Sequence, residues 1–168
     1  MRLSLIFISC VLIVIEGFSQ TLPADNAFYN PTYGSATQTI SASAGTGDDS
    51  VTFQNAIDAV NTAGGGKVIV NAGTYRFLEV DLKSNVHIEV NSGATFLPFN
   101  PSTTSNNGLF NADANVGIQN FSIIGTGGNF EVDISAYATT IRLRVINFKY
   151  CSNFKIANFN ITDNYTEF

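Results

Sequence analysis

Residues 45–96 decide the fold of this chain and read GTGDDSVTFQNAIDAVNTAGGGKVIVNAGTYRFLEVDLKSNVHIEVNSGATF. Residues 50–63 have a helical pattern, and the glycines at positions 64–66 are expected to end that helix. Short alternating segments follow, and we expect strands at Lys67–Val70, Thr74–Val80, Val86–Val90 and Ala94–Phe96. One helix followed by closely spaced short strands indicates a chain that begins to wind into a solenoid.

The expected helix has a start signal, an apolar face and a stop signal. Asp48 or Asp49 is expected to be the N-cap, because a carboxylate accepts hydrogen bonds from the free N–H groups of the first turn. Gly64 is expected to take the left-handed conformation that ends a helix. The apolar face consists of Phe53, Ala56, Ile57 and Val60. We expect this face to cap the open end of the solenoid, where strand edges and core side chains would otherwise be exposed.

A strand motif repeats later in the chain. Asn115–Ile123 and Asn153–Ile161 share the pattern N-x-x-I-x-N-F-x-I at an offset of 38 residues, and Asn85–Ile88 begins a weaker copy. A constant strand motif with a variable repeat length predicts coils with loop insertions. Asn suits the turns between such strands, since it tolerates left-handed backbone, and identical Asn side chains in stacked coils can form ladders.

Residues 1–19 have the form of an export signal. Arg2 precedes an apolar run from Leu3 to Ile15, which is too short for a comfortable membrane span, and small residues precede a cleavage point after Ser19. This segment predicts a secreted or periplasmic protein with no membrane segment once the signal is removed. Residues 20–168 then fit a single domain, and we expect the full-length protein to be monomeric.

The composition excludes several classes of function. Charged residues make up only 12% of the chain and the net charge is −5, which argues against nucleic acid as a partner. Cys10 would leave with the signal, so Cys151 has no partner for an intrachain disulfide. Cys151 and the single histidine, His87, do not make a credible zinc site, and we expect neither a metal nor a cofactor.

Several motifs of the deciding stretch resemble those of a known family. Gly45–Ser50, Phe53–Ile57, Gly64–Val70 and Ala72–Tyr75 look like the opening of the pectin-lyase-like enzymes. This resemblance implies an all-β fold, a right-handed parallel β-helix with an N-terminal capping α-helix, and an exported enzyme that degrades polysaccharides. Relatives of this architecture include polygalacturonases, pectate lyases, carrageenases and phage tailspikes, so the fold alone does not decide the function.

A second resemblance narrows the substrate. Ile141–Phe148, Asn153–Ile156 and Ile161–Phe168 are similar to iota-carrageenases, which are β-helix hydrolases of a sulfated galactan. In that family the catalytic acidic pair lies further along the β-helix. The resemblance therefore implies the N-terminal portion of a longer glycoside hydrolase for an acidic or sulfated galactan, truncated at the C-terminus, with catalytic residues unknown here. The alternatives are a uronate-polymer hydrolase or lyase of the pectin or polygalacturonate type, and a non-catalytic carbohydrate-binding or adhesive β-helix.

Four side chains in two pairs are candidates for chemistry. Glu131 and Asp133 alternate onto one face of a strand, as an acid and its partner would, but the favoured interpretation is a solvated outer face. Arg142 and Arg144 also share an outward face, and paired guanidinium groups suit sulfate or carboxylate groups. Their alternative is local pairing with neighbouring acidic residues. We take these two arginines as the best candidates for substrate binding.

The remaining candidates are weaker. Asp163, Asn164 and Glu167 are either the first edge of a substrate groove or a frayed terminus, and the frayed terminus is favoured. His87 alternates outward from its apolar neighbours, which predicts a surface residue, and nothing in the sequence supports a Ser-His-Asp triad around it.

Overall fold

The computed structural model describes residues 29–103, 107–112, 117–137 and 140–164 of the chain. The expected signal segment, residues 1–19, lies outside these described residues. The helix α1 is Ser50–Thr62. The strands are β1 Ala36–Ile40, β2 Gly66–Val70, β3 Gly73–Phe77, β4 Val80–Asp81, β5 Val86–Asn91, β6 Ala94–Pro98, β7 Asn107–Ala112, β8 Ile118–Thr126, β9 Phe130–Asp133, β10 Leu143–Phe148, β11 Cys151–Ala157 and β12 Phe159–Thr162. The expected strand at Thr74–Val80 is divided into β3 and β4 by a corner at Glu79, whose φ is +56°.

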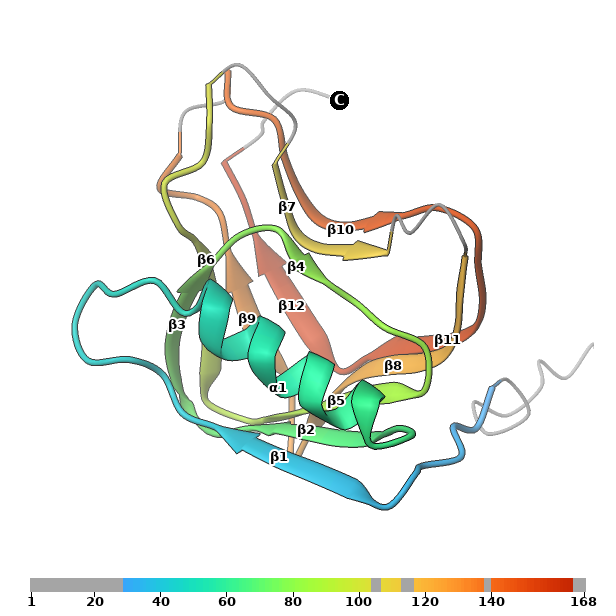
Figure 1. Ribbon diagram of the computed structural model, residues 1–168. Coiled ribbons are helices and arrows are strands. Elements are labelled where there is room, and N and C mark those ends of the chain that lie inside the picture. The colour runs from blue at the N-terminus through green and yellow to red at the C-terminus, as the bar shows by residue number, and fades with distance from the viewer. Residues whose placement is uncertain (1–28, 104–106, 113–116, 138–139, 165–168) are drawn as a thin grey trace, which may run out of the picture.

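The strands form three parallel sheets that the chain visits in rotation (Figure 1). Sheet A has the order β1-β2-β5-β8-β11, sheet B has β3-β6-β9-β12, and sheet C has β4-β7-β10. From β2 to β10, each coil therefore contributes one strand to each sheet before the next coil is laid beside it, as in a parallel β-helix. In the described part of the chain, α1 is too short and too polar to cross a membrane.

The pairing of the coils corrects the repeat expected from the sequence. Phe154 pairs with Phe121 and Ile156 with Ile123, so β8 and β11 are related by 33 residues and not by 38. Phe159, which the sequence motif aligned with Phe121, instead lies in sheet B opposite Phe130. The motif at an offset of 38 compares strands of different sheets, because similar N-F-x-I segments occur in sheet A and in sheet B.

Three left-handed asparagines occupy equivalent positions in the structural repeat. Asn85, Asn120 and Asn153 have φ values of +64°, +57° and +49°, and each directly precedes the residues that align in sheet A. The Asn120 side-chain amide donates to Oδ1 of Asn85 at 2.7 Å. The expected ladder of asparagines is therefore present between these two coils.

The core lies between the three sheets and is rich in stacked aromatic rings. Phe96 of β6 packs against Phe77, Phe110 and Phe130 with ring centroids 5.1–6.0 Å apart. Phe53 of α1 is fully buried and contacts Phe77 at 4.5 Å. Aromatic stacking along the coil axis supplies cohesion that a cysteine-poor chain does not obtain from disulfides.

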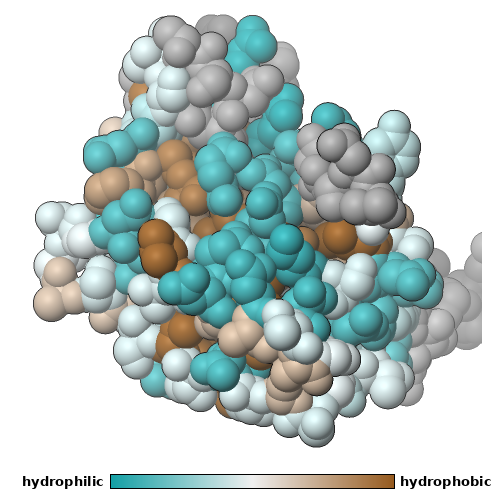
Figure 2. All heavy atoms as spheres, in the orientation of Figure 1, coloured by the Kyte–Doolittle hydropathy of each residue, from teal (hydrophilic) through white to brown (hydrophobic). Residues whose placement is uncertain are grey.

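Helix α1 crosses in front of the coil interior with its apolar face inward (Figure 1). Its buried residues are the four that the sequence pattern selected, Phe53, Ala56, Ile57 and Val60. Figure 2 shows hydrophilic residues gathered over the outer face of α1, which is turned toward the viewer. The glycine stop signal is also confirmed, because Gly64 has a φ of +92° and donates to the Asn61 carbonyl, while Gly65 donates to the Val60 carbonyl.

The start of α1 differs from the expectation. Asp49 occupies the N-cap position but makes no side-chain capping bond. Its buried carboxylate instead accepts from the backbone N–H groups of Ser43 and Arg76, which ties the loop before the helix to β3. The Asp48 carboxylate accepts from the N–H of Ser50 at 2.9 Å, so this neighbour provides the acceptor at the helix start.

A segment that precedes β1 lies against the outer face of sheet A. We refer to residues 29–35 as the lead-in segment. The Tyr29 hydroxyl donates to the Asn120 side chain, and Gly34 packs so closely on the Gly65 carbonyl that a Cβ there would lie 2.2 Å from its oxygen. The lead-in segment is thus fixed to sheet A at both of its ends.

Candidate functional site

The acidic pair of β9 is held by contacts within the protein. Glu131 and Asp133 do share the outward face of sheet B, as alternation predicted. Glu131 accepts from the Asn160 amide at 2.7 Å, and Asp133 accepts from both the N–H and the hydroxyl of Ser135 at 2.9 and 2.6 Å. These hydrogen bonds lower the pKa of Asp133 below its usual value of 3.8, which disfavours the protonated form that a general acid needs. Both carboxylates therefore have a structural explanation.

The two candidate arginines lie on the outer side of sheet C. Arg144 belongs to β10 and pairs across the sheet with Gly108 of β7, while Arg142 lies just before β10. Both side chains are exposed, and the intervening Leu143 and the following Val145 turn toward the core. The predicted shared face is therefore observed, and the Asn111 side chain occupies the space where a Cβ of Gly108, the residue paired with Arg144, would lie.

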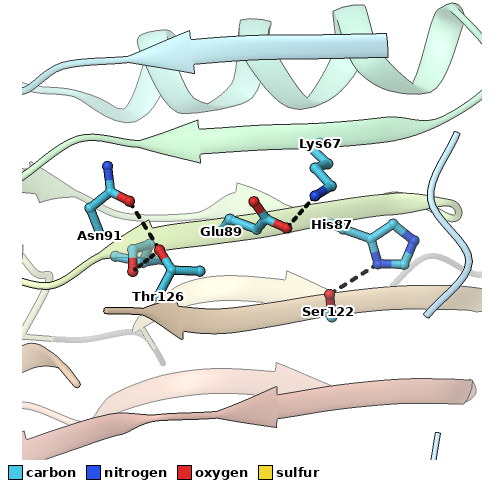
Figure 3. A network of polar contacts seen from close by, with 7 residues as sticks. Lys67, His87, Glu89, Asn91, Ser122 and Thr126 are labelled. Atoms are coloured by element: carbon cyan, nitrogen blue, oxygen red, sulfur yellow. Dashed lines mark hydrogen bonds and ion pairs between the residues drawn. The ribbon is translucent and has the colours of Figure 1, made fainter. Parts of the chain in front are cut away.

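His87 lies in a buried position and not on the surface, so the expectation for this residue is wrong. Its side chain does point out of sheet A, but it is 0% exposed because the lead-in segment lies over it. The Tyr33 ring meets the imidazole edge-on with centroids 4.8 Å apart. The Ser122 hydroxyl of β8 lies 3.0 Å from Nδ1 (Figure 3). Alternation along β5 could not reveal a cover contributed by residues more than fifty positions earlier in the chain.

A polar network surrounds His87 on the same face. Lys67 of β2 and Glu89 of β5 form an ion pair at 2.7 Å (Figure 3). The Lys67 ammonium also lies 4.2 Å from the centre of the Tyr33 ring. Further along the sheet, the Thr126 hydroxyl donates to Asn91 at 3.0 Å. Ser122 and His87 have the contact of a serine–histidine pair, but both are buried, and Nε2 has no partner among the described residues. This arrangement lacks the access and the third group that a nucleophilic triad requires.

A hollow at the corner between sheets C and A was not anticipated from the sequence. It has a volume of about 310 Å³, is open to solvent, and is lined by Ser84, Gly117, Ile118, Gln119, Tyr150 and Ser152. Tyr150 is 79% exposed and has a left-handed backbone with a φ of +52°. A positive φ is uncommon for an aromatic residue, so the exposed Tyr150 distinguishes this corner once the backbone is known.

The remaining sequence candidates are not brought together into a site. The Asn164 amide donates to the Tyr137 carbonyl at 2.7 Å, which ties the segment after β12 to the end of β9. Asp163 follows β12, and Glu167 lies outside the described residues. Among the described residues, no group of three histidine, cysteine, aspartate or glutamate side chains is arranged to hold a metal ion. The outer faces of the described coils thus carry hydrogen-bonded polar side chains, and the carboxylate pair of β9, Glu131 and Asp133, is held by hydrogen bonds within the protein.

The fold and these outer faces define the class of protein as a parallel β-helix whose sheets present polar side chains to solvent. No family model matches the sequence. The chain is 39% identical over 124 residues to the iota-carrageenase of Alteromonas macleodii, an alignment that covers 73% of this chain and 25% of that relative. It is 32% identical over 124 residues to the iota-carrageenase of Zobellia galactanivorans, covering 72% of this chain and 25% of the relative.

Solved structures give the same result at the level of the fold. An iota-carrageenase in complex with iota-carrageenan fragments superposes with a TM-score of 0.77 at 34% identity, covering 87% of this chain and 33% of that one. An iota-carrageenase of family GH82 from A. fortis gives a TM-score of 0.75 at 34% identity, with 87% and 34% coverage. The chain therefore has a carrageenase-like fold, and it spans about a quarter of the length of the curated relatives it matches.

Proposed function

We propose that this chain is part of a glycoside hydrolase that acts on a sulfated galactan such as iota-carrageenan. The observation that carries the proposal is the combination of 39% identity to one iota-carrageenase with a TM-score of 0.77 to another that binds iota-carrageenan fragments. At this identity the likeness extends beyond the β-helix architecture that many unrelated polysaccharide enzymes share. The role of the described coils is to provide the scaffold and part of the surface along which the polymer lies.

The architectural details belong to the same proposal. The β-helix is right-handed, as almost all crossovers between parallel strands are, and it is of the pectin-lyase-like type. Helix α1 acts as the N-terminal cap, because its apolar face covers the interior beside Phe77, Phe96 and Phe110. Burying this end would remove an apolar surface and unpaired strand edges from solvent.

Arg142 and Arg144 are proposed to bind sulfate groups of the polymer. Both are exposed on one side of sheet C, where a guanidinium group can form forked hydrogen bonds with an anion. The net charge of −5 makes such local positive positions necessary for a polyanionic substrate to approach.

Catalysis is proposed to depend on carboxylates other than Glu131 and Asp133. Glycoside hydrolysis needs one protonated acid near the glycosidic oxygen and one ionised partner. Glu131 and Asp133 are engaged by Asn160 and Ser135, and the lowered pKa of Asp133 opposes an acid role. The acidic pair is therefore assigned to the portion of the relatives that this chain does not span.

Affinity electrophoresis in gels containing iota-carrageenan, polygalacturonate or a neutral galactan tests the binding part of the proposal. Retardation only by iota-carrageenan is expected, and Arg144→Gln should weaken it by about three- to tenfold, as expected for the loss of one charge-assisted contact. Lys83→Gln removes one positive charge elsewhere and is the matched control. Retardation by polygalacturonate instead would favour the uronate-polymer reading and overturn the assignment.

A longer protein that includes this chain tests the reaction. It should release reducing ends from iota-carrageenan without the ultraviolet absorbance that an elimination product gives. New absorbance would identify a lyase, and binding without any cleavage would identify a non-catalytic β-helix.

Export and the monomeric state are also proposals. Arg2 and the apolar run that follows support a secreted or periplasmic location with cleavage after Ser19. N-terminal sequencing of the exported protein should begin at Gln20, and light scattering of the full-length protein should give the mass of one chain.

A further inference from the structure

The lead-in segment covers one row of side chains that crosses sheet A. In register, Lys67 of β2 lies beside His87 of β5, His87 beside Ser122 of β8, and Ser122 beside Lys155 of β11. Only the middle of this row is closed off from solvent, since His87 and Ser122 are 0% and 1% exposed. The residues that close it are themselves exposed on their outer side, so the cover is one chain thick.

His87 is the least satisfied polar group under this cover. Its Nδ1 has the Ser122 hydroxyl at 3.0 Å, but Nε2 is buried and has no hydrogen-bond partner among the described residues. A neutral imidazole tolerates this position as a largely apolar ring stacked edge-on against Tyr33. An imidazolium would have the Thr32 carbonyl near its second N–H, but without a hydrogen bond of good geometry, and it would lose its hydration, which is costly for a buried charge.

The groups around His87 have opposite effects on its protonation. Glu89 and the Thr32 carbonyl favour the protonated imidazole, while Lys67 opposes it. Tyr33 contributes its ring, Tyr29 lies further along the lead-in segment, and Lys155 lies beyond Ser122 in the row. Removal of the imidazole from water outweighs the favourable groups, so the pKa of His87 lies below its ordinary value of 6.5.

We propose that the lead-in segment is a pH-sensitive cover that leaves the face of sheet A when His87 takes up a proton. Opening brings water to Nε2 and exposes the row Lys67–His87–Ser122–Lys155 with His87 then cationic. The contacts that must be given up are those of Tyr33 with His87 and Lys67 and that of Tyr29 with Asn120. The proposal stands on the geometry of this face and is independent of the proposed activity toward galactans.

The direction of the pH dependence follows from the sign of the shift. His87 in the open state titrates near its ordinary value of 6.5, whereas in the closed state its pKa is lower. The open state therefore binds more protons between these two values, and the closed state is favoured at higher pH. As pH falls below 6.5, the equilibrium constant for opening rises by up to about tenfold for each pH unit, until the pKa of the closed state is passed.

Two measurements on the whole chain test the proposal. Because His87 is the single histidine of the sequence, the imidazole NMR signals of an untagged sample report its titration without assignment. Hydrogen exchange of backbone amides in residues 32–35 of the lead-in segment, corrected for intrinsic rates, reports opening between about pH 8 and about pH 5. We expect His87 to titrate below 6.5 and the corrected exchange of this segment to rise as it does so.

Variants separate His87 from the other acid-sensitive groups of the face. His87→Gln retains a hydrogen-bonding group for Ser122 but does not titrate, so exchange of the lead-in segment should become independent of pH. Tyr33→Ala removes the ring that covers His87 and should move its titration toward 6.5. Tyr150→Ala, an exposed tyrosine on another corner, is the control and should change neither.

Either of two results would overturn the proposal. One is a His87 signal that titrates at or above 6.5 while the lead-in segment stays protected. The other is an unchanged pH dependence of exchange in the His87→Gln protein, which would assign the opening to the Lys67–Glu89 ion pair or to another group. If His87→Gln does not fold, the titration of the unmodified protein still decides, because it needs no variant.

Discussion

At the scale of single residues, three asparagines occupy equivalent left-handed positions in β8, in β11 and just before β5 of sheet A. Asn85, Asn120 and Asn153 all have positive φ, a conformation that costs most side chains about 1 kcal/mol or more but that asparagine adopts more readily. Asn120 has further contacts, because its side chain donates to Asn85 at 2.7 Å and accepts from the Tyr29 hydroxyl. Asn120 therefore has two roles: it adopts the left-handed backbone conformation, and its side chain connects two coils and the lead-in segment.

Asn120→Ala should lower the free energy of unfolding by about 1–3 kcal/mol, from backbone strain plus the lost side-chain hydrogen bonds. Asn120→Gly removes the same hydrogen bonds but relieves the strain, so it should cost less. Chemical denaturation measures both. Gln119→Ala, at the exposed neighbouring position, is the control, and equal losses at positions 119 and 120 would refute the role given to Asn120.

Tyr75 makes a second prediction at this scale, in the alkaline range. Burial raises its pKa from 10.0 to about 12, with a smaller contribution from Asp49. Its hydroxyl donates to the Asn71 carbonyl at 2.8 Å within the core. A raised native pKa means that the contribution of this group to stability is complete below pH 10.0 and is lost as pH rises toward about 12. In an alkaline pH titration, phenolate absorbance should therefore show a last increase near pH 12, close to the unfolding transition. This increase should be missing in Tyr75→Phe.

At the scale of elements, α1 is joined to the coils by its apolar face, in which Phe53 makes the contacts with aromatic rings. Phe53 contacts aromatic residues of β3, β6 and β7 and is 0% exposed, whereas Val51 on the outer side is 66% exposed. The helix itself is short, so packing of its apolar face and not its intrinsic propensity keeps it formed.

Phe53→Ala should destabilise the chain by about 3–5 kcal/mol, because it leaves a cavity at the point where four rings meet. Phe53→Leu fills most of that volume and should cost less, which gives a folded variant if the alanine form does not fold. Val51→Ala should change the free energy of unfolding by less than about 0.5 kcal/mol. Thermal unfolding followed by circular dichroism orders the three variants, and an equal effect of Val51→Ala and Phe53→Leu would be inconsistent with this packing.

The elements also show which features the sequence could predict. The helix, its inward face and its glycine stop depend on residues that are close in the sequence, so the sequence pattern predicted them. The pairing of Phe154 with Phe121 depends on the lengths of the corner loops, and a motif match alone placed it five residues off. The burial of His87 and the missing capping bond of Asp49, which does occupy the N-cap position, were not predicted for the same reason. A distant backbone supplies the cover of one and the hydrogen bonds of the other. The outward faces of Glu131, Asp133, Arg142 and Arg144 followed from alternation, but the hydrogen bonds of the two carboxylates with Asn160 and Ser135 did not.

At the scale of the whole molecule, protection should vary from coil to coil. β5 lies between β2 and β8 and is almost entirely buried, whereas β11 and β12 each pair with one described strand and expose Phe154 and Ile161 at 40% and 48%. Stability in stacked repeats is close to a sum of each repeat and its neighbours.

Amide exchange measured along the chain should therefore be slowest in β5 and β6 and fastest in β11 and β12. A destabilising change in α1, such as Phe53→Leu, should speed exchange in the coils that contact the helix and leave β12 nearly unaffected. Uniform acceleration across all strands would show that the described coils unfold as one unit and would contradict the prediction.

The in-register stacking of parallel strands also fixes how the molecule bears mechanical load. In all three sheets the hydrogen bonds that join one coil to the next run along the coil axis, across the direction of the chain. Tension along the axis loads a few of these bonds at a time, so a coil would peel away by successive rupture at low force. Tension directed along the strands is carried by covalent backbone and must shear a whole ladder at once. A molecule of this architecture is therefore strong around its circumference and weak along its length.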